Sequence, residues 1–169
     1  MDFFYRAVVW GIYLSNLVFH MIMKILIYTF RTFPYLPELN EVFPYVFIMG
    51  SLKDDLSSFY SLIMREKPDF ILGVEASTNG TSSFESRTVN RFNKMGRVIA
   101  GGKEELSLFV PKDGLISVST SVSTGFCNYT MYSIASYIEH KKMSTRFAFC
   151  HVAVKDIKLL PSIINVISL

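Results

Sequence analysis

The feature that most constrains the fold of this chain is the alternation of short apolar segments with amphipathic ones. Residues 24–30, 45–49, 69–76 and 146–154 are apolar runs, which is the pattern of strands that are buried on both faces. Strands of this kind occur mainly in parallel sheets, because helices then cover both sides of the sheet. The sequence therefore predicts an α/β fold, a single domain with a mainly parallel or mixed central sheet flanked by helices.

Two amphipathic helices are predicted between these strands. The first spans residues 52–67, carries acidic residues in its first turn and ends before Pro68. The second follows Cys127 and has an apolar face made by Tyr129, Ile134, Tyr137 and Ile138.

Three other segments are less regular. Residues 84–90 and 115–122 alternate between polar and apolar side chains, as strands do. Residues 31–44 contain three prolines, so we expect a loop with little helix there.

The composition limits the classes of function. The net charge is only +3 and the lysines and arginines are scattered, so we expect no nucleic-acid partner, which would need a clustered basic surface. The sequence has neither paired CxxC motifs nor a glycine-rich phosphate loop, so we expect no metal and no cofactor. Cys127 and Cys150 are too few for a disulfide framework.

Residues 1–22 differ from the rest of the chain. No charged residue occurs from Ala7 to Met23, a stretch of 17 positions, which is short for a membrane span of about 20 residues. Three interpretations stay open: a signal anchor, an apolar helix packed on the domain or on a partner, and sequence foreign to the domain. We therefore expect an N-terminal extension of residues 1–22 and a domain of residues 23–169. We expect the protein in the cytoplasm, with membrane association through the extension as the alternative.

Cys127 stands directly after a turn of small residues, at the start of the second predicted helix. The backbone amides at a helix N-terminus favour a thiolate, so the position suits a nucleophile with a lowered pKa. Free cysteine is also among the most frequently buried residue types. A purely structural role for Cys127 therefore stays open at this point.

Two further residues are candidates to assist such a nucleophile. His151 interrupts the last apolar strand, and alternation puts it on the opposite face from Cys150. It is a candidate general base near a strand end, although a core histidine fits the pattern as well. Glu85 lies beside a turn-rich loop and is a candidate acid; an exposed residue paired with Arg87 or Lys94 is the alternative.

Five short motifs resemble those of one family. STGFCNYTMY resembles the cysteine motif of the pyroglutamyl peptidase I family of cysteine peptidases, FCHVAV its histidine motif and SSFESRTVN its glutamate motif. KPDFILGVEAS is similar to the strand before that glutamate, and MKILIYTFRTFPY to the first strand and loop. All five occur in the family's order between Met23 and Val154, so the chain resembles a shortened and divergent member.

The resemblance implies a phosphorylase/hydrolase-like fold and a cysteine omega-peptidase that needs no cofactor or metal. By residue match, Cys127 would be the nucleophile, His151 the base and Glu85 the acid that orients the imidazole. Phe30 and Phe33 match the two loop phenylalanines that enclose the pyroglutamyl ring in the family. The implied substrates are peptides with an N-terminal pyroglutamate.

The sequence also departs from the family pattern. Pro34 and Tyr35 replace loop glycines, most of a helix is missing between Asn90 and Cys127, and most of the closing helix is missing after His151. We therefore expect a domain trimmed of some helices, whose sheet faces need cover from residues 1–22, another subunit or a membrane. A homo-oligomer, a non-catalytic binding or scaffold protein, and a different cysteine hydrolase remain as alternatives.

Overall fold

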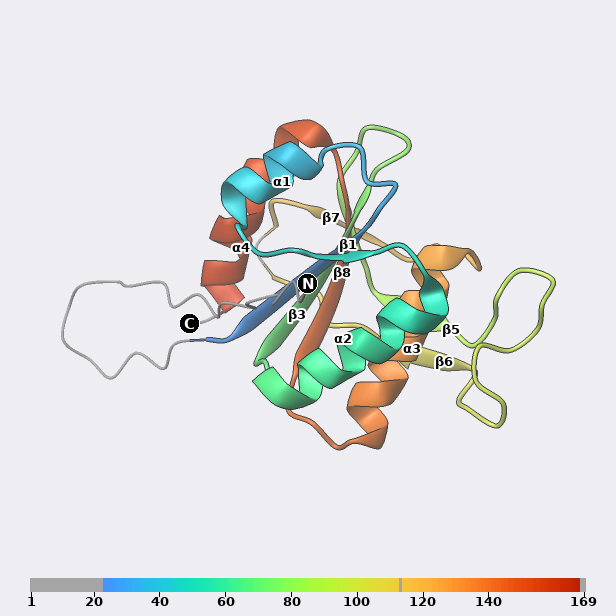
Figure 1. Cartoon of the computed structure of the whole chain (residues 1–169). Helices are drawn as coiled ribbons and strands as arrows, with labels where there is room; N and C mark the ends of the chain where they lie inside the picture. The colour runs from blue at the N-terminus through green and yellow to red at the C-terminus, as the bar shows by residue number, and fades with distance from the viewer. Residues whose placement is uncertain (1–22, 113, 168–169) are drawn as a thin grey trace.

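The computed structural model describes residues 23–112 and 114–167, which form a single α/β domain (Figure 1). A six-stranded sheet has helices on both faces, and a separate two-stranded sheet contacts α3. In chain order, the elements are β1 (Ile25–Phe30), α1 (Leu36–Val42), β2 (Phe47–Met49), α2 (Leu52–Glu66), β3 (Phe70–Ala76), β4 (Ser83–Glu85), β5 (Arg87–Val89), β6 (Glu105–Ser107), β7 (Ser117–Ser119), α3 (Phe126–His140), β8 (Arg146–Val152), the 3₁₀ helix η1 (Val154–Leu159) and α4 (Leu160–Ile167).

The large sheet is mixed, as the sequence allowed. Its strand order is β2-β1-β3-β8-β4-β7. The strands β2, β1, β3 and β8 are parallel, β4 runs antiparallel to β8, and β7 is parallel to β4. The carboxyl ends of β1, β3 and β8 therefore meet at one edge of the sheet, which is where sites form in open α/β sheets.

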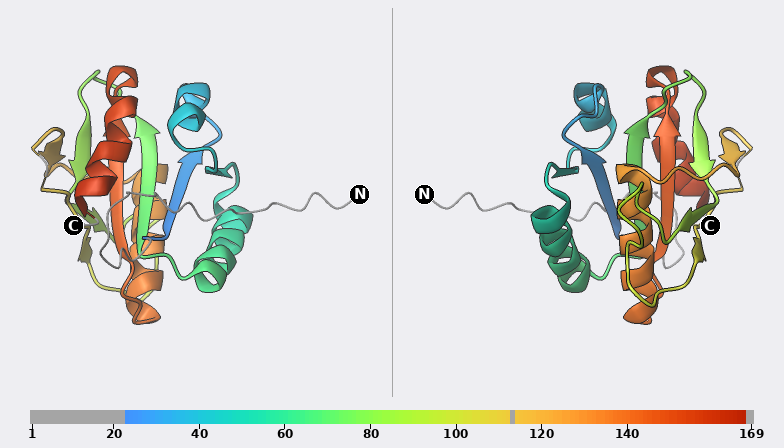
Figure 2. Two further views of the ribbon diagram at one scale, coloured as in Figure 1. Left: turned by 90° about the vertical axis from the view of Figure 1, so that its left-hand side faces the viewer. Right: turned by 90° about the vertical axis from the view of Figure 1, so that its right-hand side faces the viewer.

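Two helical layers cover the sheet, as the side views show (Figure 2). On one face α1, η1 and α4 bury an apolar cluster that includes Leu39, Ile157 and Ile163. On the other face α2 and α3 bury a second cluster that includes Phe59 and Met131. The chain's own helices thus cover much of both sheet faces, and additional cover by residues 1–22, another subunit or a membrane stays a prediction.

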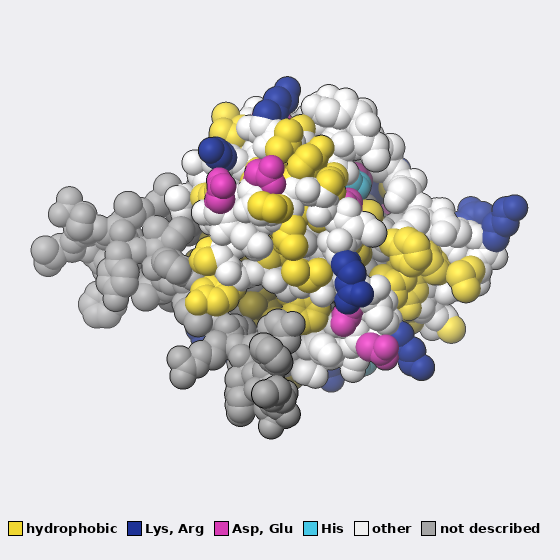
Figure 3. Space-filling model, turned by 45° about the horizontal axis from the view of Figure 1, so that its top comes forward, with side chains coloured by type: hydrophobic (Ala, Val, Ile, Leu, Met, Phe, Trp, Pro, Cys, Tyr) yellow, Lys and Arg dark blue, Asp and Glu magenta, His cyan; other side chains and the backbone are white. Residues whose placement is uncertain are grey.

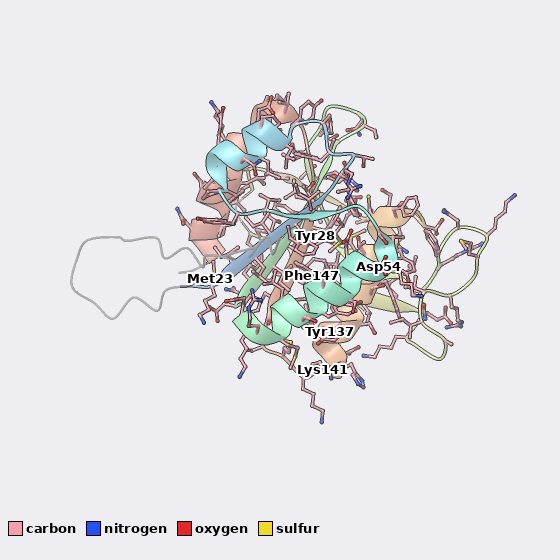
Figure 4. The ribbon with its side chains drawn as sticks, in the orientation of Figure 1. Met23, Tyr28, Asp54, Tyr137, Lys141 and Phe147 are labelled. Atoms are coloured by element: carbon pink, nitrogen blue, oxygen red, sulfur yellow. The ribbon has the colours of Figure 1, made fainter. Side chains whose placement is uncertain are left out.

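Three neighbouring residues at mid-height of the sheet pack closely together beneath α2 and α3. Tyr28 and Phe149 flank Gly73, and all three lie on the face that α2 and α3 cover. A Cβ atom at residue 73 would lie 2.4 Å from the Phe149 ring and 2.6 Å from Tyr28, so only glycine fits. Figure 4 labels Tyr28 and Phe147, which pack together in this layer (ring centroids 6.3 Å apart).

The structure corrects two predictions from the sequence. Residues 31–44 are not only loop, because α1 forms at Leu36–Val42 with Pro37 in its first turn, where a helix needs no N–H donor from the residue. Residues 84–90 do not form one strand. They divide into β4 of the large sheet and β5, which pairs with β6.

The expected N-terminal extension, residues 1–22, lies outside the described residues, so its three interpretations remain predictions. Within the described part of the chain, no helix combines the length and the apolar character that crossing a membrane requires.

Candidate active site

A cavity of about 1000 Å³ opens at the edge where the strands β1, β3 and β8 end. Figure 3 brings this end of the molecule forward, and histidine and acidic side-chain atoms are visible there in a hollow. Glu85, Cys127 and His151 all line the cavity. The three predicted catalytic residues come from β4, α3 and β8, so the fold brings together side chains that are far apart in the sequence.

Glu85 and His151 form the best-defined contact of the site. Oε1 of Glu85 lies 3.0 Å from Nδ1 of His151, and the Glu85 side chain is only 9% exposed. An ionised carboxylate accepts hydrogen bonds and cannot donate them, so Nδ1 of His151 donates to Glu85. This arrangement fixes the ring and leaves Nε2 free to take a proton from another group.

Cys127 is the second residue of α3, and the following residue anchors this end of the helix. Asn128 is fully buried. Its Nδ2 donates to the carbonyl oxygens of Val89 (2.9 Å) and Arg91 (2.7 Å), and its Oδ1 accepts from the hydroxyl of Thr88 (2.7 Å) and from the backbone N–H of Val89 (3.0 Å). The start of α3 is thereby held against β5, which fixes the position of Cys127 in the cavity.

The predicted lowering of the Cys127 pKa is wrong for the free protein. Burial raises the pKa of the Cys127 thiol to about 12, and the negative charges of Glu75 and Glu85 add to the effect. These effects outweigh the backbone hydrogen bond that lowers the pKa of this thiol. Cys127 is therefore a neutral thiol at rest and needs a base to become a nucleophile.

The two phenylalanines matched by the resemblance lie in different environments. Phe30, at the end of β1, lines the cavity. Phe33 is 4% exposed and packs edge-on against Tyr35 in the cluster beneath α1, away from the described lining of the cavity. Phe30 therefore stays a predicted contact for the pyroglutamyl ring. Phe33 instead belongs to the hydrophobic core and packs beneath the loop.

The loop after β1 has a backbone conformation that does not require glycine. None of residues 31–35 has a positive φ, so this stretch does not use the backbone conformations that favour glycine. Arg31, Thr32 and Pro34 line the cavity. The loop thus forms one wall of the cavity without the glycines of the family pattern.

Glu75 also lines the cavity, although none of the sequence motifs indicates it. Glu75 is level with His151 on the neighbouring strand, and both side chains lie on the face covered by α3. Its Oε1 accepts a hydrogen bond from the N–H of Ala76 (2.8 Å), and burial raises the pKa of its carboxyl group. The sequence does indicate the direction of this side chain, because alternation along β3 puts Glu75 on the same face as Ile71 and Gly73.

The arrangement is suited to nucleophilic catalysis by a thiol. A thiol, an imidazole that is hydrogen-bonded to a buried carboxylate, and the first-turn amides of a helix lie around one cavity. Those amides lack partners within the helix and favour a negatively charged oxygen. Among the described residues, no group of three or more His, Cys, Asp or Glu side chains is arranged to hold a metal ion.

No family model matches the sequence, and no curated protein sequence is significantly similar to it. The structure, in contrast, resembles solved structures clearly. Pyrrolidone carboxyl peptidase from Thermococcus litoralis aligns with a TM-score of 0.67 at 14% identity, over 85% of this chain and 92% of that one. The E192D mutant of the Pyrococcus furiosus enzyme aligns with a TM-score of 0.68 at 15% identity, over 85% of this chain and 97% of that one.

A third solved structure, pyroglutamyl peptidase I from Bacillus amyloliquefaciens, aligns with a TM-score of 0.59 at 17% identity, over 77% of this chain and 81% of that one. These three proteins come from different organisms, and each alignment includes most of both chains. The resemblance seen in five short motifs is thus confirmed at the level of the fold: the chain is an α/β domain with the pyroglutamyl peptidase fold.

Proposed function

We propose that this protein is a cysteine omega-peptidase that removes N-terminal pyroglutamate from peptides. The observation that carries the proposal is the hydrogen bond between Glu85 and His151 in the cavity that Cys127 also lines. The similar solved structures are named as pyrrolidone carboxyl or pyroglutamyl peptidases, which supports this substrate class.

The first half of the reaction forms a thioester. Nε2 of His151 takes the proton from the Cys127 thiol, and the sulfur attacks the carbonyl carbon that joins pyroglutamate to the next residue. Backbone amides in the first turn of α3 stabilise the oxyanion. The imidazolium of His151, held by Glu85, then protonates the leaving amine as the C–N bond breaks.

The second half restores the enzyme. His151 takes a proton from water, the hydroxide attacks the thioester, and the thiol of Cys127 leaves with the proton from His151. The products are free pyroglutamate and a peptide shortened by one residue. The five-membered lactam is flat and uncharged, so the aromatic face of Phe30 suits it.

Hydrolysis of a pyroglutamyl-fluorophore amide tests the proposal. We expect turnover by the wild-type protein and by Cys150→Ala, and loss of turnover in Cys127→Ser. Cys150 is a suitable control because it is the other cysteine, fully buried on the opposite face of β8. A folded wild-type protein without turnover would favour the non-catalytic binding or scaffold alternative.

A further inference from the structure

Glu75 occupies a central position on the floor of the cavity. The register of β1, β3 and β8 puts Phe30, Glu75 and His151 at one level on one face of the sheet. Neighbouring strands lie about 4.8 Å apart, so the carboxylate stands between the predicted ring contact and the predicted base. All three side chains line the cavity.

The carboxylate of Glu75 is incompletely paired. Within the described part of the chain, its one hydrogen-bond donor is the N–H of Ala76, which reaches Oε1. The ionisable groups that face the Glu75 side chain from the elements packed around it are the imidazole of His151 on β8, the thiol of Cys127 on α3, the carboxylate of Glu85 on β4 and the hydroxyl of Tyr28 on β1.

Two basic side chains, Arg31 and His151, lie near Glu75, and neither is hydrogen-bonded to it. Arg31 lines the same cavity, but its guanidinium lies beside Gly50 and acts on the carboxylate of Asp55. His151 donates to Glu85. No lysine or arginine among the described residues forms an ion pair with Glu75. A positively charged ligand in the cavity can therefore pair with this carboxylate.

We propose that Glu75 determines specificity, and that it lets the acyl pocket take an N-terminal proline in addition to pyroglutamate. Both residues are five-membered rings attached to the scissile carbonyl group. The ring nitrogen of an N-terminal proline is a secondary ammonium, whereas that of pyroglutamate is an uncharged lactam N–H. The ammonium pairs with Glu75 while the ring contacts Phe30. This inference rests on the proposed function for its cleavage chemistry.

The bond changes are those of the pyroglutamyl reaction. The sulfur of Cys127 forms a thioester with the prolyl carbonyl as the C–N bond breaks, the leaving amine takes a proton from His151, and water cleaves the thioester to release free proline. The substrate ammonium also neutralises the charge of Glu75, one of the two carboxylates that raise the pKa of Cys127. A bound prolyl substrate therefore makes the thiolate easier to form.

Kinetics with paired substrates test the inference. We expect the wild-type protein to hydrolyse both prolyl- and pyroglutamyl-fluorophore amides at pH 7, where an N-terminal amine is mostly charged. In Glu75→Gln, kcat/KM for the prolyl substrate should fall about tenfold or more, because a charged hydrogen bond is lost. The value for the pyroglutamyl substrate should rise, because a neutral amide removes the charge next to the sulfur. Glu41→Gln, at an exposed position on α1, should change neither value.

A binding measurement separates this inference from the proposed function. L-Prolinamide and L-pyroglutamide are used to protect Cys127 from alkylation by iodoacetamide, which requires no turnover. Prolinamide should protect the wild-type protein at a concentration about tenfold lower than it needs in Glu75→Gln, and pyroglutamide should show no such loss. Equal effects of the substitution on both ligands, or on both substrates, would overturn the role of Glu75 even in an active peptidase.

Discussion

Oε1 of Glu85 lies 3.0 Å from Nδ1 of His151, although the two residues are on strands that run in opposite directions. In this antiparallel pair Ser83 is opposite His151, so Glu85 is two residues further along β4 and its side chain extends toward the cavity. The contact fixes the orientation of the imidazole that we propose as the base.

Glu85→Gln should lower kcat for pyroglutamyl hydrolysis by about 10²–10⁴-fold. A glutamine can present its NH₂ group to Nδ1 and favour the tautomer that has its proton on Nε2, which then cannot accept the thiol proton. Steady-state kinetics measure the effect, with circular dichroism to show that the variant is folded. Glu105→Gln, at an exposed site paired with Arg87, is the matched control. A Glu85→Gln variant with more than a tenth of wild-type kcat would exclude the orienting role.

The reactivity of Cys127 should follow its raised pKa. Because burial and two carboxylates raise that pKa to about 12, the rate of alkylation by iodoacetamide in the free protein should keep rising with pH well beyond the range near 8.5 at which an ordinary thiol ionises. Measuring the rate in Cys150→Ala assigns it to Cys127 alone. A rate that levels off below pH 8 would show instead that the helix N-terminus dominates.

Asn128→Ala should destabilise the domain by about 2–4 kcal/mol, because it removes the four hydrogen bonds that the buried Asn128 side chain makes to Thr88, Val89 and Arg91. Urea denaturation measures the change in the free energy of unfolding. Asn40→Ala, at an exposed position in α1, provides the comparison and should change stability by no more than about 0.5 kcal/mol. If both variants unfolded at the same urea concentration, Asn128 would not be the anchor of α3.

Gly73→Ala should also destabilise the domain, by about 1–3 kcal/mol, since the added methyl group meets Phe149 at 2.4 Å and Tyr28 at 2.6 Å. Relief requires the two rings to move, and Phe149 packs edge-on against His151 with ring centroids 5.3 Å apart. We therefore expect kcat to fall as well. An unchanged urea midpoint would mean that the aromatic layer has more room than the structure indicates.

Periodicity predicted the elements whose burial pattern is strong. The apolar runs became β1, β2, β3 and β8, and the helical spacing of residues 52–67 became α2. It failed where the local pattern is ambiguous. The prolines of residues 31–44 predict a loop, although a proline in the first turn, as at Pro37, fits a helix. Residues 84–90 contain no glycine or proline to mark the point at which the chain passes from one sheet to the other.

The place of the three proposed catalytic residues in the fold could be anticipated from the sequence, whereas the pKa of Cys127 could not. The motifs indicated Glu85, Cys127 and His151, and the structure brings all three to one cavity. The predicted direction of the Cys127 pKa shift was wrong because the prediction considered only the backbone amides at the start of α3. The opposing effects are burial and the carboxylates of Glu75 and Glu85, which lie on strands that are distant from Cys127 in the sequence.

Acid quenching during turnover of a pyroglutamyl-fluorophore amide, followed by mass spectrometry of the peptides, detects the thioester on which the proposed reaction depends. We expect one pyroglutamyl group attached to Cys127, absent when the fluorophore amide is omitted and absent in His151→Ala. An active protein whose Cys127 remains unmodified throughout turnover, or activity that survives Cys127→Ser, would contradict it.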